Sequence, residues 1–216
     1  MPVKDVRDMK TLIISPHADD ELGCFSFLKN SEVFVVSINE SSVFSKRPHY
    51  KKRKDEMISF SKFVGAQYYS PFPEIQVNRF YNYKYELIYA VEYMIKTTKP
   101  ELILIPHPSI NQDHQTVYEA CMVALRPHDK NHFVKKVLMY ECPQSYIWGE
   151  PLTPNYFKEV DIKKKIKAYK LYKSQVRSYR SPELLKRMAE HRGKQANLKY
   201  AEGFKVVRWV NAKKRS

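Results

Sequence analysis

Two short apolar runs, each followed by a polar turn, constrain the fold most strongly. The first run is Thr11 to Ser15 and the second is Glu101 to Pro106. Apolar runs without alternation are typical of strands that are buried on both faces of a parallel sheet. In such sheets ligands bind at the edge formed by the carboxyl ends of the strands. The polar residues after the two runs are therefore expected to meet at one edge of a sheet.

The rest of the chain alternates between strand and helix patterns. Further strands are predicted at Glu32 to Ile38, Ala66 to Ser70, Lys136 to Cys142 and Phe204 to Val210. Helices are predicted from Asp20 onward, then at 50–64, 85–99, 113–125, 161–175 and from Pro182 to about Gly193. This alternation predicts one α/β domain over residues 1–210, Rossmann-like, with a mostly parallel sheet and helices on both faces. A polar loop is expected at Asn39 to Ser45 and a disordered basic tail at 211–216.

The turn after the first run contains one imidazole and two adjacent carboxylates. His17 and Asp20 are three residues apart, so they can point the same way where a strand enters a helix, while Asp19 must point elsewhere. One imidazole and one carboxylate are two of the three protein ligands that a catalytic zinc site commonly has. A simpler interpretation is that Asp19 and Asp20 cap a helix and that His17 lies on the surface.

The turn after the second run supplies a further imidazole. Asn111, Gln112, Asp113 and His114 follow the apolar run after a short segment. Because both turns are expected at the same sheet edge, His114 is the natural third ligand beside His17 and Asp20. The sequence therefore predicts a metal centre, with Zn2+ as the expected ion and another divalent metal as the alternative.

Composition excludes several classes of protein. No apolar run approaches the roughly 20 residues of a membrane span. The first ten residues are charged and lack an apolar signal region, so a cytoplasmic protein is expected. The three cysteines are widely spaced, as expected for reduced thiols rather than disulfides. The five glycines form neither a phosphate-binding loop nor a dinucleotide motif, which argues against those cofactors.

The net charge of +15 raises the question of an anionic partner. The basic residues are scattered, however, and the densest runs, Lys46 to Lys54, Lys163 to Lys173 and Lys213 to Arg215, match no nucleic-acid motif. Solvated surfaces explain this charge best, an anionic substrate comes second, and nucleic acid is least favoured. The sequence leaves the oligomeric state open.

The two turns together resemble the PIG-L/LmbE-like zinc deacetylases, which remove the N-acetyl group from N-acetylglucosamine units. The specific segments are Pro16 to Glu21 and Asn111 to His114. Weaker matches are the helix with Arg53 and Glu56 closed by Gly65, and the segments Tyr140-Glu141, Tyr172 to Gln175 and Tyr200 to Phe204. These segments extend over nearly the whole chain.

The resemblance implies roles for individual residues. His17, Asp20 and His114 would bind zinc, and Asp19 would act as the general base toward the attacking water. Arg53 would anchor the acetyl or carbonyl end of the substrate. Asp113 would orient a ligand imidazole, as metal-bound histidines generally require.

One position departs from the family pattern. Many members have a histidine three residues before the metal-binding histidine, where this chain has Asn111. Asparagine can donate a hydrogen bond to an oxyanion but cannot transfer a proton. The leaving amine would then receive its proton from Asp19 or from an unassigned group. His107 is a candidate for that group, although packing at the strand end is the simpler interpretation of this residue.

The expected function is therefore zinc-dependent hydrolysis of an N-acetylated amino sugar, free or linked to a nucleotide, phosphate, lipid or glycan. Two alternatives stay open: hydrolysis of another amide or an ester by the same metal centre, and a non-catalytic basic module that binds an anionic polymer. The metal ligands and the base argue against the last, since a binding module needs none of them.

Overall fold

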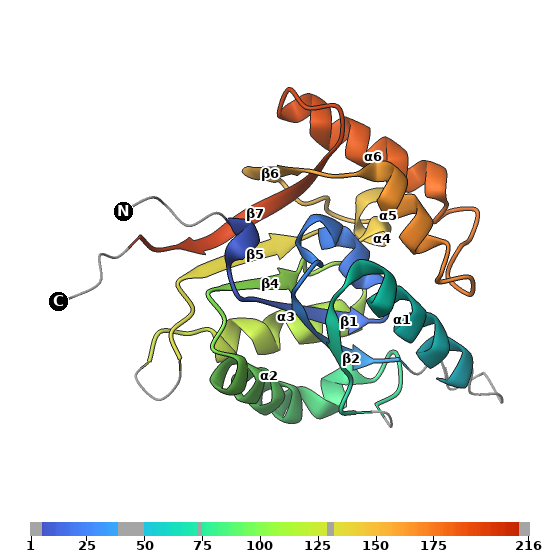
Figure 1. Ribbon diagram of the computed structural model, residues 1–216. Helices are drawn as coiled ribbons and strands as arrows, with labels where there is room; N and C mark the ends of the chain where they lie inside the picture. The colour runs from blue at the N-terminus through green and yellow to red at the C-terminus, as the bar shows by residue number, and fades with distance from the viewer. Residues whose placement is uncertain (1–5, 39–49, 73–74, 129–131, 212–216) are drawn as a thin grey trace.

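The computed structural model describes residues 6–38, 50–72, 75–128 and 132–211 (Figure 1). Its sheet has seven strands in the order β3-β2-β1-β4-β5-β7-β6. The bounds are β1 Thr11–His17, β2 Glu32–Ser37, β3 Gln67–Tyr69, β4 Leu102–Pro106, β5 Lys136–Tyr140, β6 Tyr156–Glu159 and β7 Ala201–Trp209. The first five strands in the sheet order are parallel, and β7 runs antiparallel to both β5 and β6. The predicted single α/β domain with a mostly parallel sheet is confirmed.

Helices lie on both faces of the sheet (Figure 1). The α-helices are α1 Tyr50–Val64, α2 Lys84–Thr98, α3 Gln112–Ala124, α4 Pro143–Ile147, α5 Ile162–Tyr169 and α6 Pro182–Gln195. Short 3-10 helices are η1 Val6–Asp8, η2 Asp20–Phe27 and η3 Phe80–Tyr83. Within the described residues no helix is long and apolar enough to cross a membrane.

Strand residues alternate between two cores, which explains why the strands are apolar throughout. Ile13, Val35 and Leu104 belong to a core that includes residues of α1, α5 and α6. Their neighbours Ile14 and Ile105 belong to a second core that includes residues of α2 and α3. Both faces of these strands are buried, so neither face needs polar residues.

The central strand β1 lies where the strand order reverses. The chain adds β2 and β3 on one side of β1 and then β4 and β5 on the other. Such a switch point leaves a crevice at the carboxyl ends of the two strands, where ligands bind in open α/β sheets. The fold thus places the ends of β1 and β4 at the expected position of a site.

The helix predicted after β1 differs in type. Residues Asp20–Phe27 form a 3-10 helix with a kink at Cys24 rather than a regular α-helix. A Cβ atom on Gly23 would lie 2.1 Å from the carbonyl oxygen of Glu141, so the backbone passes unusually close to the end of β5. The carboxylate of Glu202 accepts hydrogen bonds from the backbone N–H groups of Phe25 and Ser26. Contacts from distant residues therefore shape this segment.

The C-terminal part also departs from prediction. The helix predicted to reach residue 175 ends at Tyr169, and helix α4 and strand β6 were not predicted. Helix α6 and strand β7 lie within a few residues of their expected bounds. The loop expected at Asn39 to Ser45 lies outside the described residues, as does the basic tail from residue 212 onward.

Candidate metal centre

Three predicted ligands come together at the switch point between β1 and β4. His17 is the last residue of β1, and Asp20 is the first residue of η2. His114 lies in the first turn of α3, the helix that follows β4. His17, Asp20 and His114, called the trio below, thus come from two turns that the parallel topology places side by side.

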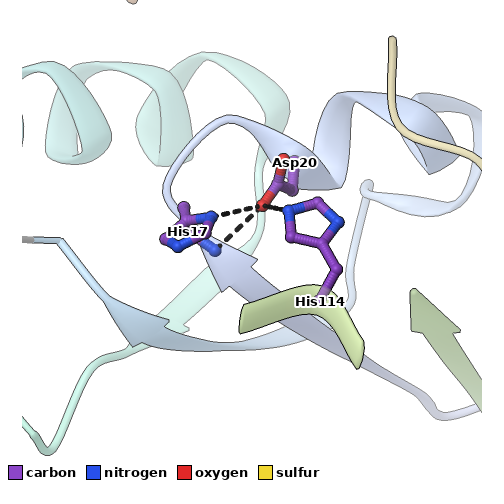
Figure 2. A group of neighbouring side chains, drawn as sticks. All are labelled: His17, Asp20 and His114. Carbon is purple, nitrogen blue, oxygen red and sulfur yellow. Dashed lines mark hydrogen bonds and ion pairs between the residues drawn. The ribbon is translucent and has the colours of Figure 1, made fainter. Parts of the chain in front are cut away.

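The carboxylate of Asp20 lies between the two imidazoles (Figure 2). Its Oδ2 atom is 3.1 Å from Nδ1 of His17 and 3.1 Å from Nε2 of His114. One ligand atom from each residue lies within 4.8 Å of the others. Ligand atoms that bind one zinc ion tetrahedrally at about 2.0–2.2 Å are roughly 3.4 Å apart. The two separations that involve Asp20 are therefore close to those of metal ligands, and the two imidazoles are near enough to bind the same ion after a small movement.

The surroundings of His114 give a direct test of whether a metal fits. This side chain is fully buried, and within the described residues Nδ1 has no hydrogen-bond partner, while Nε2 lies 3.1 Å from Oδ2 of Asp20 without the geometry of a regular hydrogen bond. A buried polar atom without a partner costs about 1–3 kcal/mol. A cation held by Nε2 would remove part of this cost, so the trio fits a divalent metal ion.

The charges in the trio also favour a cation. Burial tends to raise the pKa of Asp20, but the charges and hydrogen bonds of His114 and His17 outweigh burial and hold this pKa well below its usual range. Burial tends to lower the pKa of His17, but the carboxylates of Asp113 and Asp20 raise it to about 9. The carboxylates of Asp20 and Asp113 thus stabilise positive charge in the trio, whether a proton on His17 or a bound metal ion carries it.

Asp113 orients His17. Its Oδ2 atom is 3.0 Å from Nε2 of His17, so Nδ1 of the same ring faces Asp20. The Asp113 carboxylate also accepts hydrogen bonds from the backbone N–H groups of Asn78 and Phe80, which hold it in place. A carboxylate on the outer nitrogen of a histidine is a common support for a metal ligand.

Asn111 is the N-cap of α3. Its side-chain oxygen accepts a hydrogen bond from the backbone N–H of Asp113 at 2.9 Å, a stabilising start for a helix. His107 follows β4, and its backbone N–H donates to the carbonyl oxygen of Tyr140. Burial lowers the pKa of His107, and within the described residues its side chain makes no hydrogen bond to the trio. The chemical roles of Asn111 and His107 stay predictions.

The backbone at Asp19 is strained. Its φ of 109° is a left-handed value that residues other than glycine rarely adopt, at a cost of about 1–3 kcal/mol. The buried carboxylate of Glu21 accepts a hydrogen bond from the Asp19 N–H and others from the hydroxyl groups of Ser15, Tyr68 and Tyr172. These bonds hold the turn in a conformation that directs the Asp19 side chain away from the trio's ion pairs.

Two buried arginines face the Asp19 carboxylate. Nη2 of Arg180 is 2.7 Å from Oδ2, and Nη2 of Arg53 is 3.6 Å from Oδ1. Arg53 also donates to the carbonyl oxygen of Ala18 at 2.6 Å. Burial raises the pKa of Asp19 against the opposing charges of Arg180 and Arg53. A raised pKa is the direction required of a general base that works near neutral pH.

Sequence reasoning missed Arg180. It lies immediately before the helix start at Ser181, in a segment without a motif, and it is one of 38 lysines and arginines. Its burial and its contact with Asp19 depend on chain packing between residues far apart in sequence. An arginine next to a clear helix cap was the only available signal, and it is a weak one.

The later segments that resemble the family make buried polar contacts, one of which reaches the turn through Glu21. Tyr172 donates to Glu21 at 2.6 Å, and the backbone N–H and hydroxyl group of Ser174 donate to Glu56 at 3.0 and 2.6 Å. Glu141 forms a two-bond ion pair with Arg192, at 2.7 Å for each bond. These segments lie around the site without contributing to the trio.

Comparisons with known proteins extend this description. No protein-family model matches the sequence, and no curated protein matches it. Solved structures of similar fold include the following three. The N,N'-diacetylchitobiose deacetylase from Pyrococcus horikoshii has a TM-score of 0.70 and 16% identity, over 93% of this chain and 85% of that chain. The zinc-inhibited form of the teicoplanin deacetylase Orf2 has a TM-score of 0.66 and 16% identity, over 94% of this chain and 100% of that chain.

The third structure is named for a different reaction. It is GalB, the 4-carboxy-2-hydroxymuconate hydratase from Pseudomonas putida KT2440, with a TM-score of 0.70 and 19% identity over 96% of this chain and 100% of that chain. At these identities the likeness shows the fold, which proteins with different activities share. The chain therefore has the LmbE/PIG-L-like fold of these deacetylases.

Proposed function

We propose that this chain is a metal-dependent hydrolase, with zinc as the expected ion, that removes the acetyl group from an N-acetylated amino sugar or its conjugate. The observation that carries the proposal is the trio, in which Asp20 and His114 are buried and His17 is partly buried, with Asp19 adjacent to it in the chain. Two imidazoles and a carboxylate converge, while the carboxylate of Asp19, the residue before Asp20, is held by two arginines. A packed core requires none of these groups, and their burial costs free energy, so a functional role accounts for their presence better than packing does.

The trio would hold the metal through Nδ1 of His17, Oδ2 of Asp20 and Nε2 of His114. When bound, such an ion supplies Lewis-acid chemistry, since it polarises a carbonyl group and lowers the pKa of water. Asp113 would keep His17 in the orientation and tautomer that a ligand needs.

Asp19 would move the proton. Its Oδ1 atom is the better acceptor, because Oδ2 is already held by Arg180 at 2.7 Å whereas Arg53 is 3.6 Å from Oδ1. As a water loses a proton to Asp19, its oxygen bonds to the amide carbon; the C–N bond then breaks and Asp19 returns the proton to the leaving nitrogen. The products are acetate and the free amine.

Arg53 and Asn111 would contact the substrate. Arg53 would anchor the acetyl or carbonyl end of the substrate, in addition to its contacts with Asp19 and Ala18. The oxygen of the Asn111 side chain is engaged by the helix, so its NH2 group is the part that would donate to the developing oxyanion.

The test is acetate release together with metal analysis of the purified protein. Substrates are N-acetylglucosamine, its nucleotide and phosphate conjugates, and N-acetylated glycans. Asp19→Asn should lower acetate release by about 100- to 10,000-fold, the range of general acid–base catalysis, while the metal content is unchanged. Asp55→Asn is the matched control, because this aspartate is exposed on α1 and should leave activity unchanged.

Three outcomes would argue against the proposal. Full activity of Asp19→Asn would remove the assigned mechanism. Release of other acyl groups without acetate would favour hydrolysis of a different amide or an ester. Hydration of an unsaturated acid without acetate release would favour the reaction for which GalB is named.

A further inference from the structure

A groove of about 370 Å³ opens between helix α4 and the start of α3, the helix that carries His114. We call it the Trp148 groove. Asn111, one of its lining residues, caps the helix that carries His114. The backbone N–H of Asn78, another lining residue, donates to Asp113, which holds His17. The groove is thus placed to hold the part of a substrate that adjoins the reacting group.

None of the residues that line the Trp148 groove is charged. Most carry hydroxyl or amide groups: Asn78, Ser109, Asn111, Gln112, Gln144 and Ser145. The others are Ile110 and Trp148, whose side chains are 58% and 71% exposed. Phosphate groups are usually recognised by arginine or lysine, and none lines this groove.

Three lysines line a different groove. That groove, of about 630 Å³, is lined by Lys51, Lys52 and Lys173, together with Asp55 and Glu56. The chain's large positive charge therefore does not extend to the lining of the Trp148 groove. Net charge alone is a poor guide to what the site binds.

The start of α3 could in principle attract an anion, because helix N-termini carry partial positive charge. Here the N–H of Asp113 is already bonded to the Asn111 side chain. The buried carboxylate of Asp113 also lies in the first turn and places a negative charge there. Both features oppose the binding of phosphate at this helix end.

Side-chain amides remain available in the groove. The amides of Asn78 and Gln144 make no side-chain hydrogen bond in the part of the chain that is described. Nε2 of Gln112 donates to the Asn78 carbonyl oxygen at 2.7 Å, which leaves its own oxygen to accept. Amides both donate and accept, as sugar hydroxyl groups do, so this set suits a neutral ring with several hydroxyl groups.

Trp148 supplies a flat apolar surface at the rim. It directly precedes Gly149, whose φ of 99° is readily adopted only by glycine. A Cβ atom at Gly149 would lie 3.2 Å from Ile110, so the chain after Trp148 passes close to the other apolar lining residue. An aromatic ring placed beside polar groups is typical of ligand sites that combine apolar contact with hydrogen bonds.

We propose that the Trp148 groove binds an uncharged sugar ring adjoining the N-acetylated unit, with Trp148 packing on the face of that ring. This inference rests on the proposed function and narrows it. The enzyme would prefer a neutral oligosaccharide or glycoside to a substrate linked through phosphate.

The experiment compares three substrates: N-acetylglucosamine, a neutral disaccharide of two such units, and N-acetylglucosamine 1-phosphate. Wild type should have a kcat/KM at least about tenfold higher for the disaccharide than for the phosphate. Trp148→Ala should raise KM for the disaccharide roughly three- to tenfold, leaving kcat and the KM of the monosaccharide unchanged. Trp148→Phe should restore most of the loss. Tyr85→Ala, which removes an aromatic side chain that is 86% exposed on α2, is the control and should change nothing.

Calorimetry with the Asp19→Asn protein separates this inference from the proposed function. Binding of the disaccharide that weakens when Trp148→Ala is added supports the groove, even if no acetate is released from any substrate. Equal or better use of the 1-phosphate would overturn the inference, and so would competition by inorganic phosphate for the disaccharide. An unchanged disaccharide affinity in the Trp148→Ala protein would also overturn it.

Discussion

The parallel and antiparallel parts of the sheet contribute to the candidate site in different ways. The parallel part, β3-β2-β1-β4-β5, carries the trio and Asp113 at the ends of its strands or at the start of the following helix. The chain after β5 supplies Arg180, which contacts Asp19, and Tyr172, which contacts Glu21. The first part therefore supplies the proposed metal ligands, the proposed base and Arg53 beside it, and the second part supplies Arg180, the other arginine that faces the base.

From this difference we expect metal binding and base positioning to be separable. Substitutions of the trio or of Asp113 should change metal affinity first. Substitutions in the later segment should leave the metal in place and change the reaction rate or the stability of the fold. The variants below test that division, in order of decreasing expected effect.

The largest effect is expected for His114→Ala. Loss of one of the three ligands should abolish stoichiometric metal binding and lower acetate release by more than about 100-fold. This loss is larger than the roughly 10- to 100-fold loss expected when a residue that only orients a ligand is replaced. Metal content by elemental analysis and initial rates are the measurements. His191→Ala is the control, because His191 lies on α6 against Tyr146 and should keep full metal content. Retention of one metal per chain by His114→Ala would contradict the ligand assignment.

Asp113→Asn should have the next largest effect. Without the carboxylate, His17 loses the partner that orients its ring, and metal affinity should fall about 10- to 100-fold. A competition titration against a metal-binding dye measures this change. An unchanged affinity would mean that the contacts of Asp113 with Asn78 and Phe80 are its whole role.

Arg180→Lys should have the smallest effect on activity and should leave metal affinity unchanged. Lysine keeps the charge but not the planar geometry, so Asp19 should be less well placed and kcat should fall about tenfold. Arg192→Lys makes the same change in the buried pair with Glu141 and is the matched control. It should lower the midpoint of denaturant unfolding without lowering kcat. If Arg180→Lys and Arg192→Lys lowered kcat equally, Arg180 would have only a structural role.

The sequence could predict the parallel part because its signals are local. The apolar runs that became β1 and β4 identify buried strands, and parallel topology then places His17 and His114 at one edge. The same reasoning could not place Arg180, since nothing near it in sequence marks it for burial. The contact with Asp19 exists only after the chain beyond β5 has packed against the turn.

The later elements were harder to predict for related reasons. Strand β6 lies at the sheet edge, is only partly buried and mixes Tyr156 with Lys158, so it has no clear apolar pattern. Helix α5 stops at Tyr169 although its apolar pattern continues, and the turn that follows brings the hydroxyl group of Tyr172 to Glu21. In both places tertiary contacts rather than local preference determine the structure.

The left-handed backbone at Asp19 bears on how this chain would respond to selection. Glycine is the residue that such a conformation accepts most easily, so replacing Asp19 with glycine would relieve local strain. The same exchange would leave the buried guanidinium groups of Arg180 and Arg53 without the carboxylate that they face, which destabilises a folded protein. Relief of backbone strain alone is therefore not enough for selection for heat resistance to favour glycine at this position.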